Sequence, residues 1–304
     1  MLQQVKTALK NGNLKSKIVC SFLCKLGYSN LSLQALEVRN KAFRYFNRKY
    51  SSDLKRLIEE NKQYPLFEKN VDGGLDNIWI FWAQGFENAP KLVKKCAESV
   101  KSKMYDKKVH FIDSKNMQDY VEFPEYIMEK WRKGIISTTH LSDLLRLELL
   151  ITYGGVWLDA TVFLTDRIPD YMYSKDLFLY EHTFPDDITI TCNNFFIIAK
   201  KGNTTLNILL KILYLFWEKE TKIRDYFLWH LFMTMLLERS PDIWDGIYKI
   251  PDNLPEVLSN NILMKFDKEY WEIVKEISPI HKLSNKYNIS DNVQGTYYDF
   301  ILNN

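Results

Sequence analysis

The stretch that decides the fold is Thr139–Thr161, with the sequence THLSDLLRLELLITYGGVWLDAT. Apolar residues at helical spacing predict a helix over 139–152, and the glycine pair ends it. The apolar residues that follow predict a short strand over 156–158. The stretch therefore describes a helix, a sharp turn and a strand in immediate succession.

Two acids and an arginine occupy matching levels of this helix and strand. Asp143 and Arg146 are three residues apart, so they share a face of the helix. Arg146 precedes the glycine turn by eight residues, or about 12 Å at ~1.5 Å per residue. The strand from Gly155 to Asp159 covers about 13 Å at ~3.3 Å per residue. If the strand doubles back along the helix, the three charges converge where open α/β sheets bind ligands. The spacing alone also permits an ordinary Asp–Arg ion pair on the helix surface, followed by an unrelated acid at the end of the strand.

The sequence around this stretch alternates between strand-like and helix-like segments. We expect further strands over 77–82, 108–113, 177–181 and 189–199, and helices over 90–103, 124–133, 204–219 and 225–238. Strands and helices in alternation predict an α/β sheet with helices on its faces. Residues 1–72 show no strand alternation and predict a basic helical extension, which divides the chain into 1–72 and 73–304.

Charge is distributed unevenly along the 304-residue chain. The first 60 residues hold 12 Lys and Arg against 4 Asp and Glu, whereas the whole chain has a net charge of only +3. A basic excess confined to one end argues against a nucleic-acid-binding body.

The four cysteines have neither zinc nor redox spacing, and the apolar runs fall short of the ~20 residues that span a membrane. We therefore expect a cytoplasmic protein.

Three strings in the sequence resemble a known family. SDLLRLELLITYGGVWLDATV (142–162) resembles the donor-site signature of glycosyltransferase family 32 and the bacterial capsular polysaccharide synthesis proteins, and is similar to the glucosyltransferase domain of large clostridial toxins. IWIFWAQGFENAP (78–90) resembles the family's first strand, and HKLS (281–284) resembles the segment that closes over the donor diphosphate. The resemblance implies a GT-A-like fold, in which a nucleotide-sugar-binding mixed sheet is flanked by helices.

The same resemblance implies donor-binding roles for individual residues. Trp82 matches the position whose indole stacks on the uracil of the donor; a core tryptophan is the alternative. Asp143 and Arg146 match the pair that binds the donor's sugar hydroxyls and the glycosidic side of its phosphate. Ser142 and Trp157 match residues that line the ribose and the sugar.

The metal-binding motif of the family is incomplete in this chain. Asp159 matches the first acid of the Asp-x-Asp motif, but Thr161 stands where most of the family has the second. A neutral hydroxyl is a weak ligand for a hard cation. We expect Mn²⁺ or Mg²⁺ held by Asp159, the donor diphosphate and His281 or Ser284, with Ser284 also among the donor-binding residues. As an alternative, Lys282 and Arg146 neutralise the departing diphosphate without a metal.

Three residues are candidates for the acceptor side. Asn193 and Asn194 lie on the strand expected over 189–199, where a β-bulge or edge turn is the structural alternative. Asp225 begins an amphipathic helix and either caps it or, as the resemblance implies, lies near the acceptor.

The sequence predicts a retaining glycosyltransferase. It would move a hexose from a nucleotide diphosphate sugar, with UDP the expected nucleotide, to a lipid-linked or polysaccharide acceptor of a bacterial capsule or other surface glycan. The alternative is a non-catalytic, glycosyltransferase-like binding or scaffold protein whose metal site has degenerated. A third reading, an unrelated enzyme with a nucleic-acid-binding arm, conflicts with the 139–161 stretch, so nucleic acid is not an expected partner. The basic front suits peripheral contact with anionic lipid at the inner face of the plasma membrane; a helical subdomain packed on the sheet is the alternative.

Overall fold

A computed structural model describes residues 31–63, 73–183, 187–287, 289 and 293–303. Its centre is a mixed sheet with the strand order β2-β1-β3-β6-β5-β7. The strands are β1 (Asn77–Phe81), β2 (Lys108–Ile112), β3 (Gly155–Asp159), β5 (Leu177–Glu181), β6 (Cys192–Ala199) and β7 (Ile250–Pro251). β1 is parallel to β2 and β3, β6 is antiparallel to β3 and β5, and β7 is parallel to β5. The expected mixed α/β sheet is confirmed.

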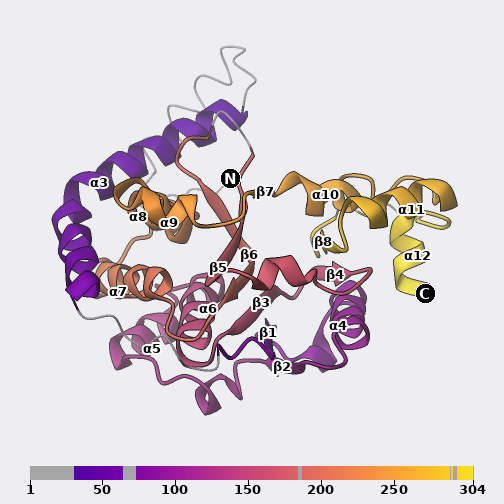
Figure 1. The fold of residues 1–304 in the computed structure, drawn as a ribbon, viewed down its shortest axis with the longest axis horizontal. Helices are drawn as coiled ribbons and strands as arrows, with labels where there is room; N and C mark the ends of the chain where they lie inside the picture. The colour runs from indigo at the N-terminus through magenta and orange to yellow at the C-terminus, as the bar shows by residue number, and fades with distance from the viewer. Residues whose placement is uncertain (1–30, 64–72, 184–186, 288, 290–292, 304) are drawn as a thin grey trace.

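Helices cover both faces of the sheet, and the two groups lie on opposite sides of it in Figure 1. On one side are α3 (Leu31–Gln63), α5 (Glu125–Arg132), α6 (Thr138–Tyr153), α7 (Thr204–Lys219), α8 (Leu228–Arg239) and α9 (Pro241–Asp245). On the other are α4 (Lys91–Lys103), α10 (Asn253–Asn260), α11 (Lys268–Ile277), α12 (Tyr297–Asn303) and the small sheet of β4 (Val162–Leu164) and β8 (Ile280–Lys282). Short 3-10 turns connect some of these elements, at Phe86–Asn88, Met117–Asp119 and Asp170–Tyr173.

The helix α6 and the strand β3 form the unit that the sequence predicts. Ser137 caps α6 by accepting a hydrogen bond from the backbone N–H of His140. Gly154 and Gly155 then turn the chain, with φ angles of 72° and 114°. A side chain at either position would meet backbone, since a Cβ would lie 2.2 Å from the Gly73 carbonyl oxygen or 2.3 Å from that of Asn77. Glycine is therefore required for β3 to follow α6 so closely.

The long helix α3 belongs to the same core as the sheet-covering helices. Its apolar stripe, expected from the sequence, includes the fully buried Phe46 and Tyr50. Phe46 stacks on Phe232 of α8 with ring centroids 5.3 Å apart and meets Phe216 of α7 edge-on at 5.6 Å. Each such contact adds to the burial of a large aromatic side chain. The remainder of the expected helical extension, residues 1–30 and 64–72, lies outside the described residues, and the division at 72/73 stays a prediction.

Two of the expected element boundaries are wrong by a few residues. The strand expected over 189–199 begins only at Cys192, because Thr189 and its neighbours hydrogen-bond to Asp187 and Thr234 instead of to a strand. The helix expected over 225–238 begins at Leu228. No helix in the described part of the chain is long and apolar enough to cross a membrane.

Candidate functional site

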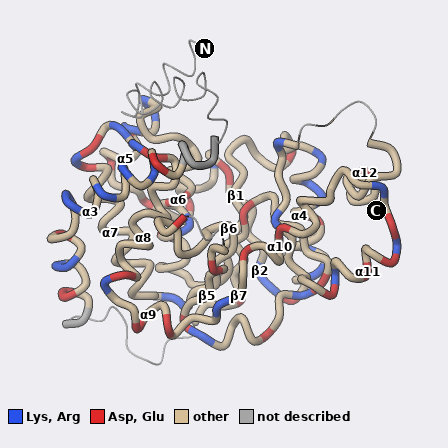
Figure 2. Tube along the Cα trace, turned by 90° about the horizontal axis from the view of Figure 1, so that it is seen from above, with Lys and Arg blue, Asp and Glu red and all other residues tan. Residues whose placement is uncertain are grey.

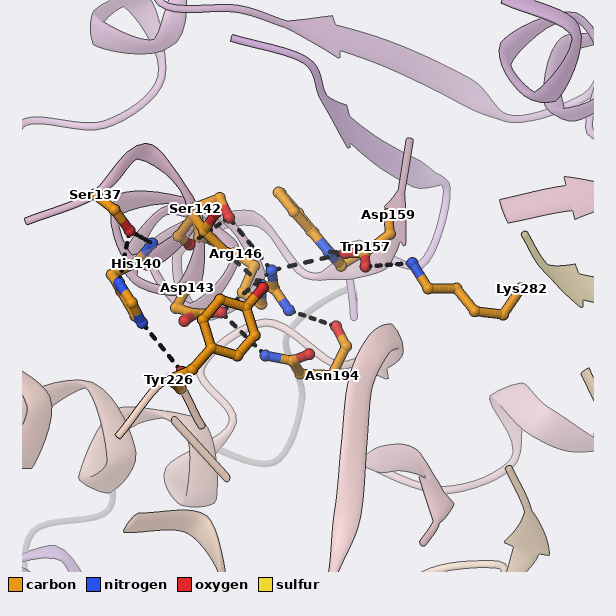
Figure 3. A network of polar contacts seen from close by, with 11 residues as sticks. Ser137, His140, Ser142, Asp143, Arg146, Trp157, Asp159, Asn194, Tyr226 and Lys282 are labelled. Carbon is orange, nitrogen blue, oxygen red and sulfur yellow. Dashed lines mark hydrogen bonds and ion pairs between the residues drawn. The ribbon is translucent and has the colours of Figure 1, made fainter. Parts of the chain in front are cut away.

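The candidate site lies at the carboxyl ends of β1 and β3, where Phe81 and Asp159 are paired in register. Asp159 is the last residue of β3, and the start of β6 runs beside it in the antiparallel direction. The neighbouring helix α6 carries Asp143 and Arg146 on the face turned toward this edge. Figure 3 shows the resulting network of side chains, which come from α6 and its N-cap residue, β3, β6, β8 and the loop before α8.

Arg146 is the centre of the network and is only 4% exposed. Its Nη2 lies 3.2 Å from Asp143 Oδ1 and 3.6 Å from Asp159 Oδ1. Its Nη1 donates to the carbonyl oxygen of Asn194 at 2.6 Å, and its Nε donates to that of Ser142 at 3.2 Å. These contacts fix the guanidinium in one orientation, because its donors have a rigid planar geometry. The convergence expected from the matched lengths of α6 and β3 is present.

The strand β8 brings the second cation to the site. Lys282 Nζ donates to Asp159 Oδ2 at 2.8 Å and to Thr161 Oγ1 at 2.9 Å. The other oxygen of Asp159 accepts from the indole N–H of Trp157 at 3.1 Å. The Trp157 ring is buried and lies 4.9 Å from the Arg146 guanidinium carbon. In this structure Trp157 therefore contacts both Asp159 and Arg146 and helps to orient them.

The two carboxylates have different environments. Burial raises the pKa of Asp143, although Arg146 acts against this shift. Burial also opposes ionisation of Asp159, but Lys282 and Arg146 outweigh it and hold the pKa of that carboxyl below its ordinary value. Asp159 is therefore an anion near neutral pH, and the site balances two acids against two cations.

The side chain of Asn194 completes the network. Its Nδ2 donates to Asp143 Oδ1 at 3.0 Å, while the backbone carbonyl oxygen of the same residue accepts from Arg146. Asn193, the preceding residue on the strand, points elsewhere and donates to Asp252. Asp252 also accepts from Thr183 and contacts the ring nitrogen Nδ1 of His182 at 2.8 Å. The structure thus brings Asn194, but not Asn193, to Asp143 of α6.

Other expected site residues lie outside this network. Asp225 Oδ1 accepts from the backbone N–H of Phe227 at 2.9 Å and lies 3.7 Å from Nε of Arg39, which ties α3 to the loop before α8. The Ser284 hydroxyl accepts from the backbone N–H of Lys286 at 3.1 Å. The described residues give neither of these side chains a contact with the network.

Trp82 follows β1 directly and is half-buried. Its backbone N–H donates to the Ile112 carbonyl oxygen at 2.9 Å. Its indole N–H is buried and has no hydrogen-bond partner among the described residues. A buried indole usually finds a partner, so this N–H stands out among the aromatic residues at the edge of the sheet. Its expected stacking on a base stays a prediction.

Tyr226 was not among the residues expected at the site. Its ring is 59% exposed, and Figure 3 places it beside Asp143, Arg146 and Asn194. Partial desolvation by the surrounding residues and the charge of Asp143 raise its pKa. His140 of α6 contacts the Tyr226 carbonyl oxygen through Nε2 at 3.1 Å. The sequence signal was weak, because Tyr226 adjoins the expected Asp225 but lies 80 residues from Arg146.

The residues at Asp159 do not fit a divalent cation. Within the described residues no group of three or more His, Cys, Asp or Glu side chains is arranged to hold a metal. His281 is fully buried and contacts Thr165 Oγ1 at 3.0 Å, so it does not join Asp159. A divalent ion about 4 Å from the Lys282 ammonium would be repelled by roughly 8 kcal/mol at an effective dielectric of ~20. Binding of the expected Mn²⁺ or Mg²⁺ itself stays a prediction, and this set of side chains does not favour it.

Comparison with known proteins gives consistent matches. The family model described as "Capsular polysaccharide synthesis protein" matches residues 27–301. The chain is similar to the O-glycosyltransferase braB of Annulohypoxylon truncatum, with 27% identity over 239 residues, 73% of this chain and 54% of the relative. It is also similar to the O-glycosyltransferase PaGT of Phomopsis amygdali, with 30% identity over 103 residues, 31% of this chain and 25% of the relative. The chain spans about half the length of the first of these relatives.

A solved structure, the PaToxG glycosyltransferase, matches with a TM-score of 0.35 and 17% identity over 69% of this chain and 81% of its own. The sequence matches identify the chain as a relative of glycosyltransferases. It belongs to the family of capsular polysaccharide synthesis proteins. The named relatives are fungal, so they give no support to the bacterial setting expected from the sequence.

Proposed function

We propose that the protein is a glycosyltransferase that moves a hexose from a nucleoside diphosphate sugar to an acceptor hydroxyl with retention at the anomeric carbon. The observation that carries the proposal is the buried network of Asp143, Arg146, Asp159 and Lys282 at the carboxyl edge of the sheet. Such edges are where α/β sheets bind ligands. The family match and the names of the relatives agree with this chemistry.

The donor is a nucleotide sugar with UDP as the nucleotide. Asp143 and Asp159 supply acceptors for sugar hydroxyls, and Arg146 and Lys282 supply the positive charge that a diphosphate needs. Trp82 offers an aromatic face for the base near the end of β1. Stacking of a base on an aromatic ring is worth about 1–3 kcal/mol.

Transfer proceeds on one face of the sugar. The acceptor oxygen forms a bond to the anomeric carbon as the bond to the diphosphate breaks, and the hydroxyl proton passes to the departing phosphate oxygen. This route needs no strong base from the protein. The main contribution of the site is to stabilise the negative charge that develops on the diphosphate. Arg146 and Lys282 perform that task from fixed positions.

The acceptor approaches over β6 and the loop before α8. Asn194 and the exposed ring of Tyr226 adjoin the acids on that side. Asn193 and Asp225 are the other acceptor residues in the proposal. A sugar hydroxyl of a lipid-linked or polysaccharide glycan is the acceptor class, since the family is that of capsular polysaccharide synthesis proteins.

The basic outer face of α3 contacts an anionic membrane surface in this proposal. Arg44, Arg48 and Lys55 are exposed there and form no ion pair with the described residues, and Figure 2 shows Lys and Arg along the helix. A lysine or arginine near an anionic leaflet contributes roughly 1 kcal/mol. Co-sedimentation with phosphatidylserine vesicles at low salt tests it: binding should fall in Arg44→Glu/Arg48→Glu and persist in Lys91→Glu on α4. Equal binding by both variants would contradict it.

A panel of nucleotide sugars tests the donor proposal. A ligand that binds only the folded protein raises its melting temperature, so a UDP-sugar should do so more than the matching GDP- and CDP-sugars. Release of UDP and a new glycoside would follow with the correct acceptor. The binding or scaffold alternative, favoured by Thr161 in the motif, predicts a thermal shift with no turnover for any donor and acceptor tested.

A further inference from the structure

Lys282 occupies the position between the two residues of the shortened acid motif. Its ammonium contacts Asp159 Oδ2 at 2.8 Å and Thr161 Oγ1 at 2.9 Å. A complete Asp-x-Asp motif, as the resemblance implies, would use its second acid to hold a divalent cation. Here a cation is already present there, and it belongs to the chain.

We propose that the Lys282 ammonium replaces the divalent cation. The protein then binds the donor diphosphate, and stabilises it as a leaving group, without a metal. The inference rests on the proposed function for the identity of the ligand. It does not depend on turnover for its test, because cation binding at Asp159 is measured directly.

Backbone hydrogen bonds hold Lys282 beside the motif. β8 pairs with β4 in the antiparallel direction, with Lys282 opposite Val162. The N–H of Leu283 donates to the carbonyl oxygen of Thr161 at 2.9 Å, which joins the segment to the motif itself. The Lys282 side chain is 24% exposed, so it is held at the rim and does not extend into solvent.

The alternation of β8 explains why His281 cannot assist a metal at this point. Consecutive side chains of a strand point to opposite faces. Lys282 faces Asp159, and His281 faces Thr165 in the interior with its Nδ1 buried and without a partner among the described residues. The strand can present the lysine or the histidine to Asp159, and it presents the lysine.

Thr161 is the residue that makes the replacement possible. An ammonium has three N–H donors and no acceptor. Asp159 and Thr161 accept from two of them, and the third is available to a phosphate oxygen. A second acid at 161 would place two carboxylates beside one ammonium and leave one negative charge uncompensated. Two carboxylates suit a divalent ion instead. The neutral threonine matches a single positive charge.

A Mn²⁺-binding assay tests the inference. Electron paramagnetic resonance detects the free ion, so loss of its signal measures binding, with and without UDP. Without UDP the wild-type protein should leave the signal unchanged at millimolar Mn²⁺, and the double variant Thr161→Asp/Lys282→Met should bind the ion; with UDP each signal is compared with a protein-free sample, because UDP itself binds Mn²⁺. UDP should bind the wild-type protein equally in EDTA and in Mn²⁺. Lys282→Met alone should weaken UDP binding about 10- to 100-fold, and the exposed neighbour control Lys286→Met should not.

Binding of Mn²⁺ by the wild-type protein that is lost in Asp159→Asn would overturn the inference, as would a folded double variant that binds no Mn²⁺. If the double variant does not fold, the single variant decides: unchanged UDP affinity in Lys282→Met contradicts the role of the lysine. Failure of the proposed function looks different, because then no nucleotide sugar binds under any condition while the Mn²⁺ results still stand.

Discussion

Replacing Arg146 by alanine tests how the site is stabilised. Arg146 is 4% exposed and faces both acids. Without it Asp159 keeps the Lys282 ammonium at 2.8 Å, but among the described residues Asp143 keeps only the hydrogen bond from the amide of Asn194 at 3.0 Å. The variant therefore leaves one buried carboxylate without a compensating charge. Breaking a buried pair in this way costs about 3–5 kcal/mol of the free energy of unfolding.

The cost in Arg146→Ala should depend on pH. Burial already raises the folded-state pKa of Asp143, and loss of Arg146 raises it further. For an acid whose folded pKa lies above its unfolded value, the folded state retains the proton longer, so stability falls as pH rises above about 4. The deficit relative to the wild-type protein should therefore shrink by about 1–2 kcal/mol between pH 7.5 and pH 5.

Urea unfolding followed by tryptophan fluorescence at both pH values measures the deficit. Arg132→Ala is the matched control, because its ion pair with Glu125 is exposed and should contribute no more than about 1 kcal/mol. A deficit in Arg146→Ala below 1 kcal/mol at both pH values would refute the idea that Arg146 compensates a buried charge.

Three further predictions concern the base, the buried histidine and the N-terminal helix. Trp82→Ala should weaken UDP binding by about 1–3 kcal/mol in calorimetry, with a smaller loss in Trp82→Phe; equal affinity would place Trp82 outside the donor site. Burial lowers the pKa of His281 to about 3, so the unfolded chain takes up this proton first and stability is lost as pH falls below about 6.5. His281→Asn should flatten the stability–pH curve between pH 6.5 and 4.5, and an unchanged slope would contradict the assignment. Phe46→Ala should lower the free energy of unfolding by about 3–5 kcal/mol, as for other fully buried aromatic residues; a loss below 1 kcal/mol would show that α3 is not part of the core.

The local part of the site could be predicted from the sequence. Asp143, Arg146 and Asp159 lie within one helix–turn–strand unit, and the glycine pair and the matched lengths determine which side chains meet. The position of Lys282 came from the resemblance, since nothing in the spacing of residues 123 apart indicates a contact. The alternation of a strand would have shown that His281 and Lys282 cannot both face Asp159.

The contacts on the proposed acceptor side could not be predicted from the sequence, because long-range packing determines them. Tyr226 reaches the acids through a loop that Arg39 of α3 holds, where the guanidinium lies 3.9 Å from the ring centroid of Phe227. Asp252 meets His182 from a part of the chain 70 residues away. Each contact depends on how two distant elements are placed, and neither segment carries a recognisable spacing.

The most direct measurement of the central claim is the release of UDP from UDP-sugars by the purified protein, with Asp159→Asn and Arg146→Ala compared at matched folded fraction. The account predicts turnover of at least one UDP-sugar by the wild-type protein and a loss of at least about 100-fold in each variant, since in the proposal Arg146 stabilises the charge on the diphosphate and Asp159 accepts from the sugar and holds Lys282 in place. Turnover unchanged by both substitutions would contradict the assignment of this site.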